Sequence, residues 1–221
     1  MRTLICALLS MAVFATTASA GDSKSKRHRK LRHPEVTYFL TPTTGFTIRT
    51  PRRSFGTEIT VKRFAEAVAA VRKKHGPSAK LPVGDLSYLG GGRMRPHRSH
   101  RDGRDIDVGY YFKDGEPRKW FKRARPESLD AARTWTLFKT MLDSGDLEYI
   151  FVDWRLQKAL YHYALTQGET KKSLKTVFQY PRWRGQRTGV IRWERGHADH
   201  FHVRFKHSDE SSTAHQDQPK E

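Results

Sequence analysis

The sequence predicts an α+β fold, in which helices surround a small and mostly antiparallel sheet. Two kinds of segment support this prediction. Some segments have apolar residues at every second position, as strands do, and others have them at every third or fourth position, as amphipathic helices do. The two kinds do not follow the regular βαβ order that a parallel sheet requires. The length of 221 residues fits a single domain, which we expect to span residues 35–206.

The first 20 residues have the three parts of a secretory signal. Arg2 gives a positive start, residues 4–14 form an apolar core too short to span a bilayer, and residues 18–20 form a small-residue cleavage site. The single cysteine, Cys6, would be removed with this segment. We therefore expect an exported protein, periplasmic or secreted, without disulfides and without a transmembrane anchor.

The chain is strongly basic, with 42 Lys and Arg against 23 Asp and Glu and a formal net charge of +19. A basic exported protein is attracted to polyanions. Outside the cytoplasm these are cell-wall polymers and anionic lipid headgroups, so we expect anionic wall polymers to bind the basic surface and expect no nucleic-acid partner. Residues 21–34 form a predicted flexible basic arm, which serves either solubility or wall binding. Residues 207–221 form a predicted disordered polar tail.

The first half of the domain is predicted to contain four strands and one helix. The helix has apolar residues at i, i+3, i+4 and i+7 positions between Val61 and Val71, and Gly76-Pro77 ends it. The strands have alternating or continuous apolar residues beside turn residues. In order, the predicted elements are strands at 36–40 and 45–49, a helix at 60–75, and strands at 81–89 and 105–112.

The second half is predicted to contain two helices and two strands. The second of these helices has an aspartate, Asp153, in position to cap its start. The stretch between that helix and the last strand has no clear periodicity and is interpreted as a long surface loop. In order, the predicted elements are a helix at 128–142, a strand at 147–152, a helix at 154–165, a loop at 169–192 and a strand at 200–206.

Residues with metal-ligand chemistry occur on two of these predicted strands. His100 and Asp107 are seven positions apart, with a glycine turn between them, and Asp107 lies on a strand. His200 and His202 form an H-x-H pattern on the last strand, where alternate residues point to the same side. If the two strands meet, they form a site with imidazoles and a carboxylate, a common ligand set for catalytic zinc. A third histidine of that segment, His197, is left over.

These motifs resemble those of the LAS metallopeptidases. The resemblance rests on H-x6-D, from His100 to Asp107, followed by the distant H-x-H. Within that group, the segments at 96–100, 103–107 and 197–204 are similar to penicillin-insensitive murein endopeptidases. A looser similarity extends over residues 36–206.

The resemblance implies a LAS/Hedgehog-like fold and a zinc ion bound by His100, Asp107 and His202, with a water in the fourth position. It implies that His200 acts as general base on this water. It also implies that His197 hydrogen-bonds the tetrahedral intermediate or helps to protonate the leaving amine. The implied activity is hydrolysis of the peptide cross-links of peptidoglycan, between D-Ala and a diamino acid, without a covalent intermediate. The alternatives are a D-Ala-D-Ala carboxypeptidase of the same family and a non-catalytic, zinc-containing wall-binding module.

Several roles stay open at this point. For His97 there are three alternatives: it touches the metal, it orients a metal ligand, or it faces solvent. Asp105 fixes the tautomer of a histidine or is a solvated surface residue. Strand alternation points Asp199 away from the site, although a bulge would bring it in. Related dipeptidases use a glutamate near this position, so Asp199 or Glu194 is an alternative base to His200.

Some aromatic and basic residues are open to two interpretations as well. Tyr110, Tyr111, Trp183 and Trp193 either form walls for a substrate or pack in the core. Three arginines either bind substrate carboxylates or only add to the basic charge, namely Arg93, Arg95 and Arg98.

Overall fold

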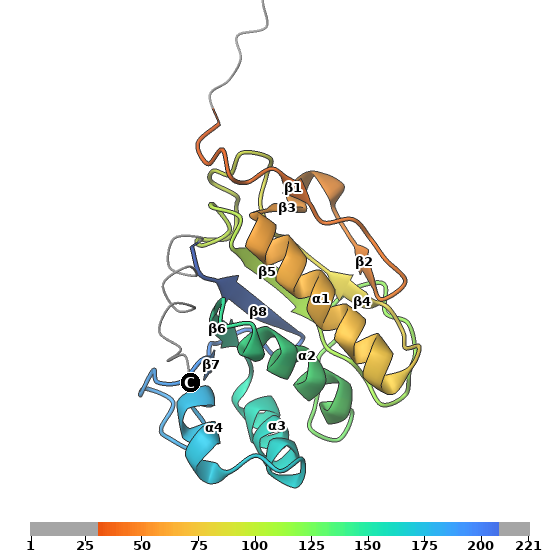
Figure 1. Ribbon diagram of the computed structural model, residues 1–221, viewed down its shortest axis with the longest axis vertical. Coiled ribbons are helices and arrows are strands. Elements are labelled where there is room, and N and C mark those ends of the chain that lie inside the picture. The colour runs from red at the N-terminus through yellow and green to blue at the C-terminus, as the bar shows by residue number, and fades with distance from the viewer. Residues whose placement is uncertain (1–30, 208–221) are drawn as a thin grey trace, which may run out of the picture. The chain divides into compact units, whose positions relative to one another are not determined.

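The computed structural model describes residues 31–207. The predicted secretory signal lies outside the described residues, as do most of the predicted basic arm and nearly all of the predicted tail. The described residues form four α-helices, a six-stranded sheet and a separate two-stranded sheet. The predicted α+β class is therefore confirmed (Figure 1).

The six-stranded sheet carries the elements that matter for the site. Its strand order is β2-β4-β5-β8-β6-β7, and the three inner pairings are antiparallel whereas the two outer pairings are parallel. The last strand of the described residues, β8, thus lies in the middle of the sheet. The strands are β2 Phe46–Ile48, β4 Leu81–Val83, β5 Asp105–Gly109, β6 Leu147–Phe151, β7 Ile191–Arg192 and β8 His200–Phe205. The small sheet pairs β1 Tyr38–Phe39 with β3 Phe55–Gly56.

Each α-helix begins after a residue whose side chain caps it. The capping oxygens accept hydrogen bonds from backbone N–H groups of the first turn, which would otherwise lack partners. The caps are Thr57, Asp130, Asp153 and Thr170. The helices are α1 Glu58–His75, α2 Ala131–Asp143, α3 Trp154–Thr166 and α4 Lys171–Val177, and a short 3₁₀ helix spans Pro51–Arg53. Within residues 31–207, no helix is long and apolar enough to cross a membrane.

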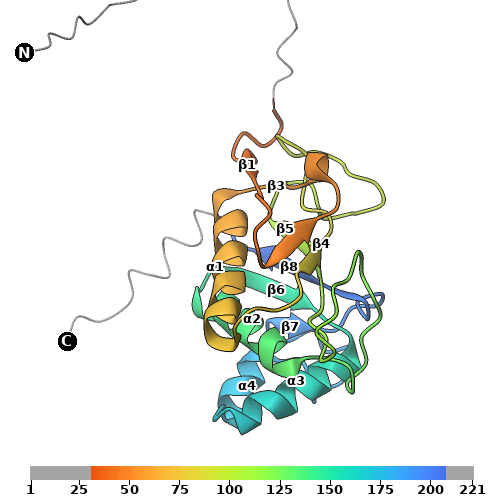
Figure 2. The same cartoon turned by 90° about the vertical axis from the view of Figure 1, so that its right-hand side faces the viewer.

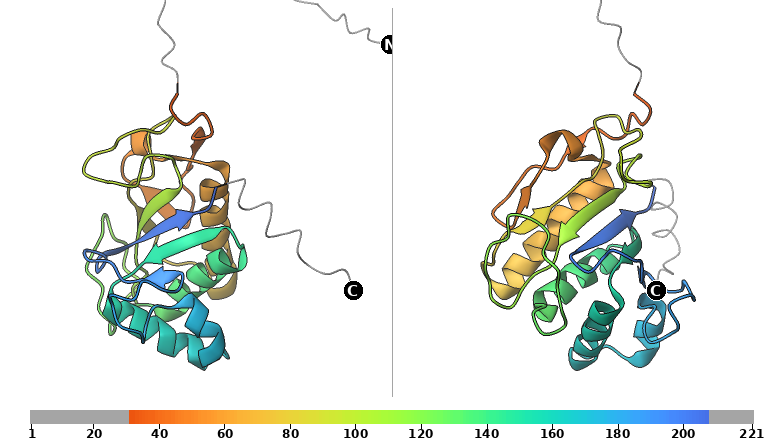
Figure 3. Two further views of the ribbon diagram at one scale, coloured as in Figure 1. Left: turned by 90° about the vertical axis from the view of Figure 1, so that its left-hand side faces the viewer. Right: turned by 180° about the vertical axis from the view of Figure 1, so that it is seen from behind.

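Helices α1 and α2 cover one face of the large sheet (Figures 1 and 2). On that face Phe201 of β8 meets Phe138 of α2, with 4.9 Å between ring centroids. Ile106, Val108 and Val203 are fully buried in the same core. On the opposite face no helix of residues 31–207 covers β5 and β8 (Figure 3, right). Because side chains alternate along a strand, the polar residues of both strands point to this open face.

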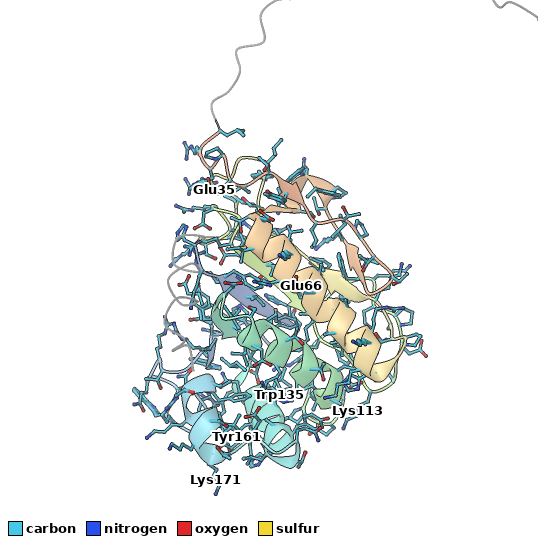
Figure 4. All side chains as sticks on the ribbon, viewed as in Figure 1. Glu35, Glu66, Lys113, Trp135, Tyr161 and Lys171 are labelled. Carbon is cyan, nitrogen blue, oxygen red and sulfur yellow. The ribbon has the colours of Figure 1, made fainter. Side chains whose placement is uncertain are left out.

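The predicted loop at 169–192 is wrong, because this stretch contains α4 and β7. Thr170 and Ser173 form a capping box that starts α4. Leu174 and Phe178 are fully buried, and the Phe178 ring packs against Trp135 and Tyr161, which Figure 4 labels on α2 and α3. The stretch is thus held by contacts with distant helices rather than by its own periodicity.

The predicted strand at 81–89 is also too long, since β4 ends at Val83. Beyond that residue the backbone stays bonded to β5 only at Gly84 and Asp85, through Asp107, and then turns to other partners. The Leu86 carbonyl accepts from a histidine ring and the Ser87 carbonyl accepts from the Phe55 N–H. A Cβ at Gly84 would lie 2.8 Å from the Phe121 ring. The glycine therefore lets the loop that carries Phe121 pack closely against the chain at this point.

Candidate metal centre

The site is built on the pairing of β5 with β8. The register places Asp107 opposite His202, Asp105 opposite Arg204 and Gly109 opposite His200. All these positions lie on the open face of the sheet, because Ile106, Val108, Phe201 and Val203 fill the core on the other face. Two short segments far apart in the sequence are therefore fixed against each other by one ladder of backbone hydrogen bonds.

Three of the predicted ligands converge on this face. His100 Nε2 lies 3.3 Å from Asp107 Oδ2, and His202 Nδ1 lies 2.9 Å from Asp107 Oδ1. The two ring nitrogens are 3.2 Å apart. All three residues are buried. Three nitrogen and oxygen donors thus point to one small volume.

Hydrogen bonds fix which ring nitrogen faces this volume. His100 Nδ1 donates to the carbonyl of Leu86 at 2.9 Å, which leaves Nε2 free to bind a metal. His202 Nε2 lies 2.8 Å from Asp105 Oδ1, which leaves Nδ1 facing Asp107. Partners of this kind commonly orient histidine ligands and raise their basicity. Of the two roles left open for Asp105, the geometry therefore favours the one in which its carboxylate fixes the tautomer of His202. Asp105 is fully buried and forms an ion pair with Arg204.

The donor set fits a small divalent cation. Ligand bonds of 2.0–2.1 Å in a tetrahedral arrangement would place the ligand atoms about 3.3 Å apart. The separations of 2.9, 3.2 and 3.3 Å are close to this value. Burial alone would raise the pKa of Asp107, but His100 and His202 hold it well below its usual range, so the group stays a carboxylate.

His97 also turns its ring toward the site. Its Nδ1 lies 3.7 Å from Asp107 Oδ2, and its ring centroid is 4.2 Å from that of His100. Its Nε2 lies 2.9 Å from Asp85 Oδ2, which also accepts from Arg53 at 2.8 Å. His97, His100 and Asp107 offer donor atoms that together could hold a metal ion. Of the three roles left open for His97, facing solvent fits this geometry least.

His202 holds an extra proton when no metal is bound. Burial alone would lower the pKa of its ring, but hydrogen bonds and charge interactions with Asp105 and Asp107 outweigh burial and raise the pKa to about 9. The protonated, positively charged ring lies between the carboxylates of Asp105 and Asp107. A metal that binds Nδ1 must therefore displace this proton.

His200 and Asp199 form a pair beside the three converging donors. His200 Nδ1 lies 2.6 Å from Asp199 Oδ1, so this nitrogen carries the proton and Nε2 carries a lone pair. His200 Nε2 lies 4.0 Å from Asp107 Oδ1. Asp199 therefore contacts the site through His200, and the carboxylate orients the ring.

His197 completes the group of rings. Its centroid is 4.9 Å from that of His200 and 6.1 Å from that of His202. Its Nδ1 donates to the Glu194 carbonyl at 3.2 Å. Burial, with the nearby His200 and His202, lowers the pKa of His197 to about 4, so the ring is neutral at pH 7.

Part of the chain is similar to a known protein family. Residues 41–148 match the family model of penicillin-insensitive murein endopeptidases. This is the family that the motifs predicted, and the matched range includes His97, His100 and Asp107. The match indicates a peptidase of the murein endopeptidase kind. No curated protein matches the chain.

The murein endopeptidase match ends before the segment that carries His197, His200 and His202. The fold joins this segment to the matched part through the β5·β8 pairing. The two halves of the predicted constellation are therefore connected by strand register, which is independent of the family match.

Sequence reasoning did not identify Phe121, which contacts a residue of the candidate site. The Phe121 ring is stacked on His200 at 4.7 Å between centroids, and Trp120 stacks on the other side of Phe121 at 4.0 Å. Figure 2 shows the loop between β5 and α2, which carries Phe121, on the side of the sheet away from α1. A Cβ at Gly84 would collide with this ring and a Cβ at Gly109 would touch it. No local pattern in the sequence indicates this contact.

Two of the four aromatic residues that could have formed substrate walls lie in the core. Tyr110 and Tyr111 are buried, so the interpretation as walls is wrong for them. Trp183 is 77% exposed. Trp193 lines a groove of about 1250 Å³ that reaches Asp199, and it is the one of the four that lies beside the candidate site.

Proposed function

We propose that this protein is an exported zinc endopeptidase that hydrolyses peptide cross-links of peptidoglycan, between D-Ala and a diamino acid, in the periplasm or outside the cell. The observation that carries the proposal is the convergence of His100, Asp107 and His202 beside the Asp199–His200 pair. Two histidines and one carboxylate are a ligand set typical of catalytic zinc. The family match supports the murein substrate.

In this proposal the ligands would be His100 Nε2, His202 Nδ1 and Asp107, with His97 Nδ1 within reach. A zinc ion held there would lower the pKa of a bound water to about 7 and polarise the scissile carbonyl. His200 Nε2 takes a proton as general base, because Asp199 holds the proton of the ring on Nδ1. Phe121 keeps the His200 ring in its plane.

His197 has a more restricted role than the one implied at first. Because Nδ1 donates to Glu194, Nε2 has no proton of its own to offer an oxyanion. A ring with a pKa of about 4 releases a proton readily once it has received one. We therefore propose that His197 receives on Nε2 the proton that His200 has taken, and passes it to the leaving amine. The scheme needs no serine or cysteine nucleophile, so β-lactams would have no group to acylate.

The test is digestion of purified cross-linked muropeptide dimers with and without a zinc chelator, followed by mass spectrometry. Conversion of dimers to monomers that stops with chelator and returns with zinc is the expected result. Loss of only a terminal alanine would make the enzyme a carboxypeptidase. Binding of zinc and of the wall without any released peptide would overturn the catalytic proposal in favour of a binding module.

Replacing Asp105 with asparagine should weaken zinc binding. The variant removes the carboxylate that accepts from His202 Nε2, and loss of such a partner typically costs about 10–100-fold in metal affinity. Titration against a competing chelator measures the effect. Asp114→Asn is a matched control, since Asp114 is an exposed aspartate that pairs with Arg118 on the surface. Equal affinities of the two variants would remove Asp105 from the site.

Zinc affinity should rise with pH because His202 must lose its proton. Its pKa in the metal-free protein, about 9, lies above the ordinary value of 6.5, so the proton is present at pH 7 and leaves on binding. One displaced proton makes the dissociation constant fall about tenfold per pH unit below pH 9. Chelator competition between pH 6 and pH 8, corrected for the chelator, measures the slope. A flat profile would mean that Nδ1 does not bind the metal.

A further inference from the structure

A groove of about 1250 Å³ adjoins the candidate catalytic pair. It lies between the first half of α3, the loop at 123–127 and the loop at 193–199. Asp199 lines it, and the same carboxylate orients His200. A hydrogen bond of 2.8 Å from the Ala124 N–H to the Ala198 carbonyl joins the two loops. A molecule in this groove would therefore lie next to the proposed base.

The groove is lined by cations that the protein does not neutralise. Three acidic residues line the same groove: Asp153 caps α3, Asp199 bonds to His200, and Glu127 forms no ion pair with another residue of 31–207. Within residues 31–207, none of the six basic side chains in the groove forms an ion pair. The arginines near the metal ligands differ, since Arg53 pairs with Asp85 and Arg204 with Asp105. The six are Arg123, Arg125, Arg155, Lys158, Arg184 and Arg195.

Two tryptophans give the groove flat surfaces between these charges. The guanidinium of Arg184 lies 5.5 Å from the Trp154 ring and 5.4 Å from the Trp193 ring. Such contacts hold an arginine without using its hydrogen-bond donors. The groove thus offers planar donors beside apolar walls, which suits an extended peptide with carboxylates better than a neutral sugar chain.

We propose that this groove binds an acidic peptide stem of the murein substrate, and that its arginines recognise the free carboxylates of that stem. The inference rests on the proposed function, and it names the part of the substrate whose binding sets the affinity. A peptide stem carries free carboxylates at its C-terminus and on any acidic side chain. Arginine binds carboxylates through two parallel hydrogen bonds. The position beside Asp199 would place the peptide bond to be cut within reach of His200.

Binding and turnover can be separated by measuring both with one substrate. Binding of a cross-linked muropeptide is measured by calorimetry on the His200→Ala protein, which should not consume it, with Arg155→Gln, Arg195→Gln or both added. Arg52→Gln is the matched control, because Arg52 is exposed, lies away from the groove and carries the same charge. The same arginine variants with His200 intact give kcat and KM.

Each groove arginine should contribute about fivefold to the dissociation constant, as expected for a partly solvated charge-assisted hydrogen bond. The double variant should raise KM by more than about tenfold while kcat changes less than about twofold. Amidation of the muropeptide carboxylates should weaken binding to the parent protein, and it should weaken binding to the double variant by a smaller factor. Equal affinities of Arg52→Gln and the double variant would overturn the inference, as would affinity that follows glycan length instead of amidation. If wild-type protein fails to cleave, the proposed function fails, and calorimetry still decides the role of the groove.

Discussion

Replacing His100 with alanine is expected to abolish zinc binding and hydrolysis together. His100 Nε2 is one of three donors that lie 2.9–3.3 Å apart, and two donors cannot hold the ion as three do. The loss of affinity should exceed the 10–100-fold typical of changes to a ligand's partner. Zinc is worth several kcal/mol in the transition state, and about 1.4 kcal/mol is tenfold in rate, so hydrolysis should fall roughly 10³-fold or more.

The measurement combines metal content with muropeptide hydrolysis on the same preparation. His207→Ala is a suitable control, because His207 is an exposed histidine just after β8. It should keep both properties. Full hydrolysis by the His100→Ala protein would contradict the proposed ligand set, even if the control behaves as expected.

Replacing His200 with alanine should have a different outcome, with zinc retained and the rate lost. His200 Nε2 is 4.0 Å from Asp107 Oδ1, near the ligands, while its Nδ1 is held by Asp199. Loss of a general base costs about 10²–10⁴-fold in rate. Asp199→Asn should cost less, because the ring stays in place on Phe121 and only its orientation and basicity change.

The pH profile of kcat/KM separates a base from a structural residue. In wild-type protein the acidic limb should follow one ionisation of the free enzyme, and this limb should disappear in the His200→Ala variant. A variant that loses zinc as well as rate would place His200 among the ligands. A variant that keeps full activity would return the role of base to Asp199 or Glu194.

The convergence of His100, Asp107 and His202 could be anticipated from the sequence because part of the pattern is local. The spacing of His100 and Asp107 around a glycine turn is a pattern within eight residues, and H-x-H on a strand directs both rings to one side. The same alternation places Arg204 on the face of His202, so its part in holding Asp105 could have been found in this way.

Other parts of the site could not be predicted because they depend on tertiary contacts. Phe121 reaches His200 from a loop that has no periodicity, and Asp85 reaches His97 from a stretch that was expected to be a strand. The prediction also missed α4, although the capping pair Thr170 and Ser173 was a local signal. Its single apolar stripe is short, and Leu174 is buried by packing on distant elements.

The central position of β8 has a consequence for when the protein becomes active. This strand is the last element of residues 31–207, yet it joins β5 to β6 in the middle of the sheet. Until it is available, the two halves of the sheet have open edges and the site lacks His200 and His202. We therefore expect hydrolytic capacity to appear only after β8 has been synthesised, so that a chain interrupted before β8 carries no working peptidase.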